Sequence, residues 1–162
     1  SSSSRGLGDV YKRQGVATAI ACDMRIATKD TKYGIPAAKL GLAYGFDNLR
    51  QLVELVGPSN AKRILFTGDL IDADDAHRIG LVDELCALDE LEDKVLSIAD
   101  KISANAPLTV LASKETVKHV LRPEIRDHQK LKEMAKICFD SDDYREGREA
   151  FMEKRKPEFK GR

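Results

Sequence analysis

Apolar and polar positions follow different rhythms in the two halves of the chain, and the first half alternates between helix and strand signals. Residues 15–22 are small and apolar on every side, which predicts a short buried helix. Short strands are expected at 24–28 and 32–34, on either side of the polar turn 28–31. Pro36 suits the first position of a single helical turn. These alternating signals predict an α/β structure.

Further helices in this half are each expected to end at a glycine. Asp47 can cap a helix that ends at Gly57, and a second helix closes at Gly68. Asp72 can cap a third helix, which stops at Gly80, and a strand is expected to begin directly afterwards.

The second half is helical throughout. From about residue 88 onward the apolar positions recur at helical spacing. Pro107 separates the first two of these helices, and Pro123 ends the second. Further helices are expected over 131–138 and 144–155, with no strand signal between them. This pattern predicts an α-helical region that follows the α/β part.

The domain boundary is expected near Cys86-Ala87, with the α/β part at 15–87 and the helical region at 88–162. Residues 1–14 are of low complexity, and 9–14 resembles a translated frame of a transposon end used in sequencing libraries. We therefore interpret residues 1–14 as a disordered cloning or assembly scar. A disordered native terminus is the alternative.

Composition narrows the classes of function. The 162 residues carry 27 Lys+Arg and 27 Asp+Glu, and this balance excludes the basic footprint of a nucleic-acid binder. Neither a long apolar run nor a signal peptide is evident, so no membrane partner is expected and the predicted location is cytoplasmic. The 3 cysteines are far apart in the sequence, which favours reduced thiols. No spacing indicates a metal site.

A series of short motifs resembles the crotonase (enoyl-CoA hydratase/isomerase) superfamily in order and spacing, over essentially all of 15–162. They lie at Gly15, 21–27 (Ala-Cys-Asp-Met-Arg-Ile-Ala), 33–36 (Tyr-Gly-Ile-Pro), 40–42 (Leu-Gly-Leu), 52–57, 66–73, 76–82 and 146–157. The resemblance implies a spiral of ββα units followed by a helical C-terminal region, of which this chain is similar to the C-terminal portion only. It also implies an acyl-CoA substrate, with no cofactor beyond the coenzyme A that the substrate carries.

The resemblance implies an oxyanion hole, made by two backbone N–H groups, that stabilises a thioester enolate. One donor would lie in a part of the family fold that this chain lacks. Gly15 aligns with the last glycine of the turn that supplies the other, so it is expected at the edge of the site; a glycine needed for close helix packing is the alternative. By the same alignment Pro36 and Ala37 border the substrate. The two glutamates of family hydratases fall at Ala17 and Ala37, which argues against straightforward hydration.

Tyr44 occupies a position that resembles the tyrosine of methylmalonyl-CoA decarboxylases in the same superfamily, which also lack the paired glutamates. A neutral phenol can donate a hydrogen bond to a departing carboxylate. We therefore predict that Tyr44 is catalytic. The alternative is an ordinary half-buried loop tyrosine.

Lys154 lies in a Phe-x-Glu-Lys-Arg stretch whose lysine, in the family, reaches the phosphates of coenzyme A, commonly on a neighbouring subunit. Phe151 would then lie against the adenine or the pantetheine. A basic helix terminus favoured by the helix dipole is the alternative for this cluster. The family's helical region also packs subunits together, which implies a homo-oligomer, either a trimer or a dimer of trimers.

Other reactive side chains receive structural interpretations. His77, His119 and His128 have no ligand spacing and are expected on the surface. Cys22 is expected to be a small core residue.

Three hypotheses stay open: an acyl-CoA enzyme of the hydratase/isomerase family, a decarboxylase-like lyase, and a non-catalytic truncated fragment that binds acyl-CoA or assembles. The chain by itself is expected to be poorly soluble or partly unfolded, and inactive.

Overall fold

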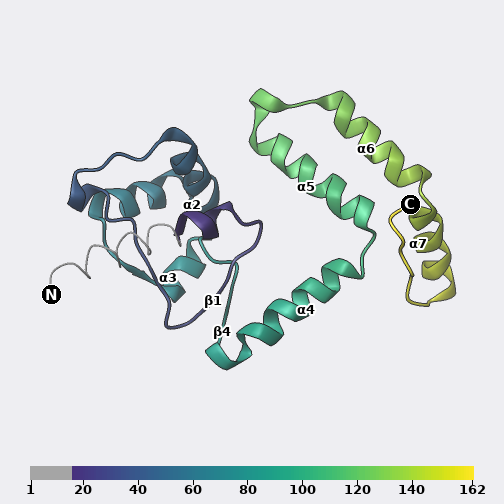
Figure 1. Ribbon diagram of the computed structural model, residues 1–162, viewed down its shortest axis with the longest axis horizontal. Coiled ribbons are helices and arrows are strands. Elements are labelled where there is room, and N and C mark those ends of the chain that lie inside the picture. The colour runs from purple at the N-terminus through teal and green to yellow at the C-terminus, as the bar shows by residue number, and fades with distance from the viewer. Residues whose placement is uncertain (1–15) are drawn as a thin grey trace. The chain divides into compact units, whose positions relative to one another are not determined.

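The computed structural model describes residues 16–162, which divide into two compact units, one reaching Lys94 and the other running from Val95 to Arg162 (Figure 1). The interpretation of residues 1–14 as a scar and the assignment of Gly15 to the site fall outside the described residues. Each unit is considered by itself.

The first unit is built from short strands and helices that alternate along the chain. Its elements are a helical segment at residues 16–21, β1 (Ile26–Thr28), β2 (Lys32–Tyr33), the 3-10 turn η1 (Ala38–Leu40), α2 (Phe46–Thr67), β3 (Ile71–Asp72), α3 (Ala73–Arg78), β4 (Glu84–Cys86) and η2 (Leu88–Glu90). β1 pairs with β4 in parallel, and β2 pairs with β3 antiparallel. The parallel pair requires a crossover, which the helices between the strands provide. The predicted α/β class is confirmed.

Two helices in this unit end at the predicted glycines, Gly57 and Gly68. At Gly57 the backbone leaves the helical region (φ 75°, ψ 163°), so α2 consists of two helices joined at a kink. Gly68 ends the second of them in a left-handed conformation, with its N–H donating to the Ile64 carbonyl. The expectation that Asp47 caps the first helix is wrong: Gly45 is the N-cap residue, and Asp47 lies in the first turn.

At α3 the capping prediction is confirmed, because the Asp72 carboxylate accepts a hydrogen bond from the Asp75 N–H at 2.8 Å. The strand expected directly after Gly80 begins only at Glu84. The N–H groups of Leu81 and Val82 instead donate to the Ala76 carbonyl, at 2.9 and 3.2 Å, and close the end of α3.

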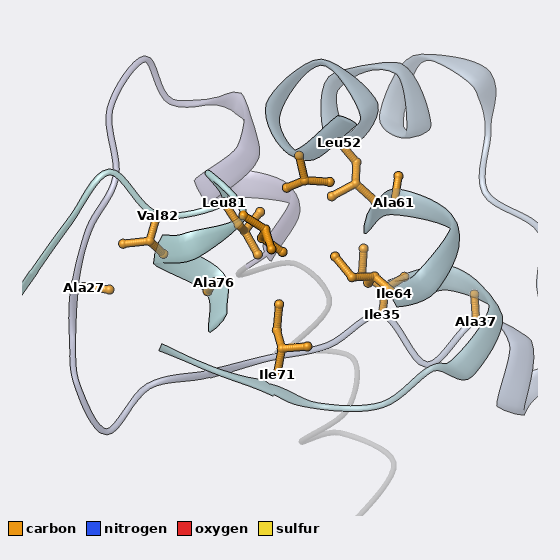
Figure 2. Packing of buried hydrophobic residues seen from close by; sticks show 12 residues of the cluster. Ala27, Ile35, Ala37, Leu52, Ala61, Ile64, Ile71, Ala76, Leu81 and Val82 are labelled. Atoms are coloured by element: carbon orange, nitrogen blue, oxygen red, sulfur yellow. The ribbon is translucent and has the colours of Figure 1, made fainter. Parts of the chain in front are cut away.

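A cluster of buried apolar side chains joins both parts of α2 to α3 and the strands (Figure 2). Leu52 and Val82 are its largest fully buried members. The segment at 16–21 contributes Val16 and Ile20 to the edge of this cluster, but its other side is open, so the prediction of a fully buried helix is wrong. Cys22, at the end of that segment, is exposed rather than in the core for the same reason.

The second unit holds the helices predicted for the second half. They are α4 (Leu91–Ser103), which spans the boundary, α5 (Pro107–Leu121), η3 (Pro123–Ile125), α6 (His128–Asp140) and α7 (Asp142–Glu153), with no strand among residues 95–162. Pro107 begins α5, and Pro123 follows its end, as the sequence predicts. No described helix is both long enough and apolar enough to cross a lipid bilayer.

His119 is not a surface histidine. Its side chain is buried at the α5–α6 connection, where Nδ1 accepts a hydrogen bond from the Asp127 N–H at 3.2 Å. The Arg126 Nε donates to the His119 carbonyl at 3.3 Å. The histidine therefore ties the end of α5 to the start of α6, a role that its sequence neighbours do not reveal.

Candidate functional site

Tyr44 lines a small cavity in the first unit. The cavity measures about 30 Å³, which is room for roughly one water molecule. Its walls are Val16, Ala17, Gly34, Ile35, Tyr44, Asn48, Leu49 and Leu52. Tyr44 and Ala17, which the sequence singled out separately, therefore share one cavity wall although they lie in different elements.

The turn after η1 sets the path of the chain toward Tyr44. The Ala37 carbonyl accepts hydrogen bonds from the N–H groups of Leu40 and Leu42, at 3.1 and 3.0 Å, and the Pro36 carbonyl accepts one from Lys39 at 3.1 Å. Ala37 is buried, and Tyr44 is half-buried against the core cluster. Pro36 and Ala37 thus shape the approach to Tyr44, while neither is among the described residues that line its cavity.

The chemistry that this cavity can support depends on its polar groups. Tyr44 offers a phenol, which at neutral pH both donates and accepts a hydrogen bond, and Asn48 offers an amide. Among the described lining residues there is no carboxylate, and Ala17 contributes only a methyl group. The cavity can therefore orient a polar group, but its walls supply no side chain that would take up a proton from water at neutral pH.

Arg25, which the sequence reading passed over, anchors the far end of the 16–21 segment. Its guanidinium is buried and donates to the carbonyls of Leu81 (2.9 Å) and Cys22 (2.7 Å). It also forms an ion pair with Asp83 at 3.0 Å. The sequence did hold one indication of this role, because Arg25 directly precedes the apolar strand β1. An arginine at such a position is buried with the strand, and a buried guanidinium needs several hydrogen-bond acceptors.

The predicted CoA contacts lie in the second unit, at the end of α7. Lys154 ends this helix in a left-handed conformation (φ 55°, ψ 36°), with its N–H donating to the Phe151 carbonyl at 3.3 Å. The next N–H, of Arg155, donates to the Ala150 carbonyl at 3.0 Å. These bonds close the helix in the manner of a Schellman motif and leave the Lys154 side chain exposed.

The basic residues of this turn differ in what they contact. The Arg155 guanidinium forms a bidentate pair with Glu146, at 2.6 and 2.9 Å, and a further contact with Glu153 at 2.6 Å. The Lys154 ammonium forms no ion pair within residues 16–162. Lys154 is therefore available to an external anion, whereas the charge of Arg155 is already matched.

The pairing with Arg155 strongly perturbs the Glu146 carboxyl of α7. Hydrogen bonds from the Arg155 guanidinium, and then from the Glu158 N–H at 2.8 Å, lower the pKa of the Glu146 carboxyl to about 2. The carboxylate is therefore ionised throughout the physiological range.

Phe151 borders an apolar groove formed by α5, α6 and α7, with a volume of about 1260 Å³. Phe151 is 82% exposed. Phe139 and Tyr144 line the same groove and meet edge to face, with ring centroids 5.3 Å apart. Such an exposed ring suits contact with another apolar or aromatic surface.

The carboxylate of Asp143 is buried at the start of α7. It accepts hydrogen bonds from the N–H groups of Lys160 (2.6 Å) and Gly161 (2.8 Å). It therefore ties the C-terminal tail, which is the segment 154–162 after α7, to the helix.

No group of three or more side chains within residues 16–162 is arranged to hold a metal ion.

Comparison with known proteins gives a consistent answer. The family model described as enoyl-CoA hydratase/isomerase matches residues 13–162. A crotonyl-CoA hydratase of Syntrophomonas wolfei is 39% identical over 146 residues, which are 90% of this chain and 56% of that protein. A short-chain-enoyl-CoA hydratase of Clostridium acetobutylicum is 38% identical, with 91% of this chain and 58% of that protein covered. The chain thus spans a little over half the length of these curated relatives.

Solved structures agree with the sequence matches. A crystal structure from Hyphomonas neptunium, described as a putative enoyl-CoA hydratase/isomerase family protein, superposes with a TM-score of 0.84 at 32% identity. The superposition covers 91% of this chain and 56% of that one.

Proposed function

The chain belongs to the enoyl-CoA hydratase/isomerase family, and from that premise we propose that the protein carrying it acts on an acyl-CoA thioester. Its crotonase-like α/β fold is that of the family. The observation that carries the proposal is the family match, which extends over residues 13–162 and includes both the Tyr44 segment and the Lys154 turn.

The proposed mechanism stabilises a thioester enolate. Two backbone N–H donors would hold the enolate oxygen in an oxyanion hole, where one donor is typically worth about 10²–10³-fold in rate. We assign Gly15 to the edge of that hole. Pro36 and Ala37 are assigned to the border of the acyl-CoA site, because their carbonyls fix the turn that leads to Tyr44.

The relatives named above are hydratases, but hydration needs proton transfer at two atoms of the substrate. A base must take a proton from the attacking water, and an acid must protonate the α-carbon; one such group typically contributes about 10²–10⁴-fold. The family's glutamate positions hold Ala17, in the wall of the Tyr44 cavity, and the buried Ala37. Hydration would thus need other side chains to act as the base and the acid, because neither alanine can transfer a proton.

These alanines favour a second candidate, decarboxylation of a malonyl-type thioester. The bond between the α-carbon and the carboxylate would break, CO₂ would leave, and the electron pair would form the enolate, which then takes a proton from solvent. This reaction needs the oxyanion hole and a donor that orients the carboxylate, but no strong base. The Tyr44 phenol, in the same cavity wall as Ala17, is the group that we assign to this orientation.

We assign the Lys154 ammonium to a CoA phosphate and the Phe151 ring to the adenine or the pantetheine. The support is that Lys154 is exposed and has no ion pair among the described residues, and that Phe151 is 82% exposed. A cytoplasmic homo-oligomer, a trimer or a dimer of trimers, is part of the proposal. A non-catalytic fragment is the competing hypothesis.

Turnover of two thioesters by the intact protein that carries this chain tests the proposal. We expect methylmalonyl-CoA to be consumed faster than crotonyl-CoA, with release of CO₂. Faster turnover of crotonyl-CoA would overturn the decarboxylase candidate and support the hydratase/isomerase function. If neither thioester were bound or turned over, the proposed acyl-CoA function would be wrong.

A further inference from the structure

The turn after α7 is held by an ion pair between Glu146 and Arg155, to which the proposed function assigns no role. We propose that Glu146 and Arg155 are positioning residues, whose paired hydrogen bonds hold this turn in the conformation that presents the Lys154 ammonium to a CoA phosphate. The inference rests on the proposed function, which assigns Lys154 to that phosphate.

The first support is the backbone of Lys154. Within residues 16–162 it is the one non-glycine residue with a positive φ. An L side chain costs free energy in this conformation, which is why glycine commonly ends helices in such motifs. A residue stays in a costly conformation only where its surroundings determine it, and such residues concentrate at functional sites. The presence of a lysine rather than a glycine at this position is therefore explained if the lysine side chain binds a ligand.

The second support is the fixed position of the neighbouring guanidinium. Arg155 binds both carboxylate oxygens of Glu146, at 2.6 and 2.9 Å, across a gap of nine residues. The same Glu146 accepts the Glu158 N–H at 2.8 Å. Glu146, in the middle of α7, therefore holds the chain that follows Lys154 at two points, the Arg155 guanidinium and the Glu158 N–H.

The third support separates this contact from the general attachment of the tail. The tail runs back along α7, and its last carbonyl, that of Arg162, accepts the Asp142 N–H at 2.7 Å (Figure 1). The buried Asp143 carboxylate binds the Lys160 and Gly161 N–H groups. These bonds do not involve Glu146. Loss of the Glu146 charge should therefore release the Lys154 turn while the tail stays attached.

Binding of CoA fragments to the intact protein tests the inference. The probes are CoA, dephospho-CoA and pantetheine, and their dissociation constants are measured by calorimetry. Glu146→Gln should weaken CoA binding by roughly tenfold, as loss of one charged hydrogen bond does, and change pantetheine binding less than about twofold. The dephospho-CoA arm shows whether the contact is to the 3′-phosphate or to the pyrophosphate. Asp140→Asn, which breaks the exposed Lys136–Asp140 pair of α6, is the matched control and should change none of them.

Two further variants complete the test. Lys154→Ala should reproduce the effect of Glu146→Gln, and the double variant should bind CoA no more weakly than Lys154→Ala alone, because both act through one contact. Arg155→Lys keeps the charge but loses the two-pronged geometry, so it should weaken CoA binding as well; it answers the question if Glu146→Gln fails to fold.

Two results would overturn the inference. One is a Glu146→Gln variant that weakens pantetheine and CoA equally, since the role would then be structural. The other is a Lys154→Ala variant that loses the preference for CoA while Glu146→Gln and Arg155→Lys retain it. A wild-type protein that binds CoA no more tightly than pantetheine would instead show that the assignment of Lys154 in the proposed function is wrong.

Discussion

The two units of the chain maintain their structures by different means. Among the described residues, every buried hydrophobic side chain except Ala150 belongs to the first unit. The second unit buries the polar side chains of His119, Ser141 and Asp143, while the first buries Arg25 and Thr28 beside its apolar core. The first unit is therefore held mainly by apolar packing, and the second mainly by hydrogen bonds at helix ends.

This difference leaves the apolar side chains of the second unit exposed. Leu111, Val117 and Val120 of α5 are 53%, 59% and 62% exposed. Exposed apolar faces of this kind usually meet another surface, which agrees with the proposed oligomer. The proposed sites differ accordingly: Tyr44 rests on a packed core, whereas Lys154 rests on a turn held by charges.

The largest expected effect is a core substitution in the first unit. Leu52 is 1% exposed, so Leu52→Ala in the intact protein should lower the free energy of unfolding by about 2–5 kcal/mol. Leu111 is 53% exposed within one copy of the chain, so Leu111→Ala should lower it by less, and by less than about 0.5 kcal/mol where no second copy covers this residue. Urea denaturation measures both. Equal losses would break the comparison, because Leu111 would then be packed as tightly as Leu52, as it could be against a second copy in the proposed oligomer.

The second prediction concerns the polar interior of the second unit. Asp143→Ala removes a buried acceptor from the Lys160 and Gly161 N–H groups, and should destabilise this unit by about 2 kcal/mol. Hydrogen exchange of the α7 and tail amides measures the loss. Asp142→Asn is the control, because the Asp142 carboxylate is exposed and, within residues 16–162, accepts its side-chain hydrogen bond from the exposed Arg145 and attracts Lys160 and Arg162 by charge alone. Unchanged protection in Asp143→Ala would show that packing, not this carboxylate, holds the tail.

A third prediction tests the site on the packed unit. Tyr44→Phe removes one hydroxyl from the cavity wall and keeps the ring, so the core should be undisturbed. In the intact protein we expect kcat for methylmalonyl-CoA to fall roughly tenfold, about the value of one hydrogen bond to a charged group, with little change in KM. An unchanged kcat would identify Tyr44 as an ordinary loop tyrosine.

Local signals were sufficient to predict most of the helix limits. The glycines at 57 and 68 end helices because their backbone has positive φ, and Pro107 and Pro123 act through the missing N–H. These effects involve neighbours in the sequence, so a single sequence contains them. Membership of the enoyl-CoA hydratase/isomerase family was predicted from the order and spacing of the short motifs, and the family match over residues 13–162 confirms it.

Burial and distant contacts were not predictable in the same way. The surface assignment of His119 and the core assignment of Cys22 both failed, because burial depends on which elements cover a side chain. Asp143 lies at the start of a helix, but the partners of its carboxylate are backbone N–H groups 17 and 18 residues away. Ala17 and Tyr44 line the same cavity because the fold brings them together. The spacing of residues along the sequence does not predict this proximity.

A smaller effect is expected at Lys154 itself. Lys154→Gly removes a side chain from a left-handed position, and should raise the free energy of unfolding by about 0.5–1 kcal/mol after the greater freedom of glycine in the unfolded chain is counted. Thermal or urea denaturation of the intact protein measures the gain. Lys156→Gly, at a neighbouring exposed lysine without positive φ, is the control and should give no gain. A loss of stability in Lys154→Gly would mean that the lysine is not strained.

The smallest expected effect is the pH dependence of the Lys154 turn. The hydrogen bonds from Arg155 to Glu146 lower the pKa of the Glu146 carboxyl from an ordinary value of 4.5 to about 2. Because the folded-state pKa is the lower one, the stabilisation is fully present above pH 4.5 and is lost as the pH falls from there toward 2. The Glu158 amide, which donates to Glu146, reports this loss through its NMR chemical shift. In Glu146→Gln the shift should be independent of pH over this interval. A wild-type transition centred near pH 4.5 would mean that the ion pair does not hold the turn in solution, and the polar scaffold of the second unit would then rest on Asp143 and the helix caps alone.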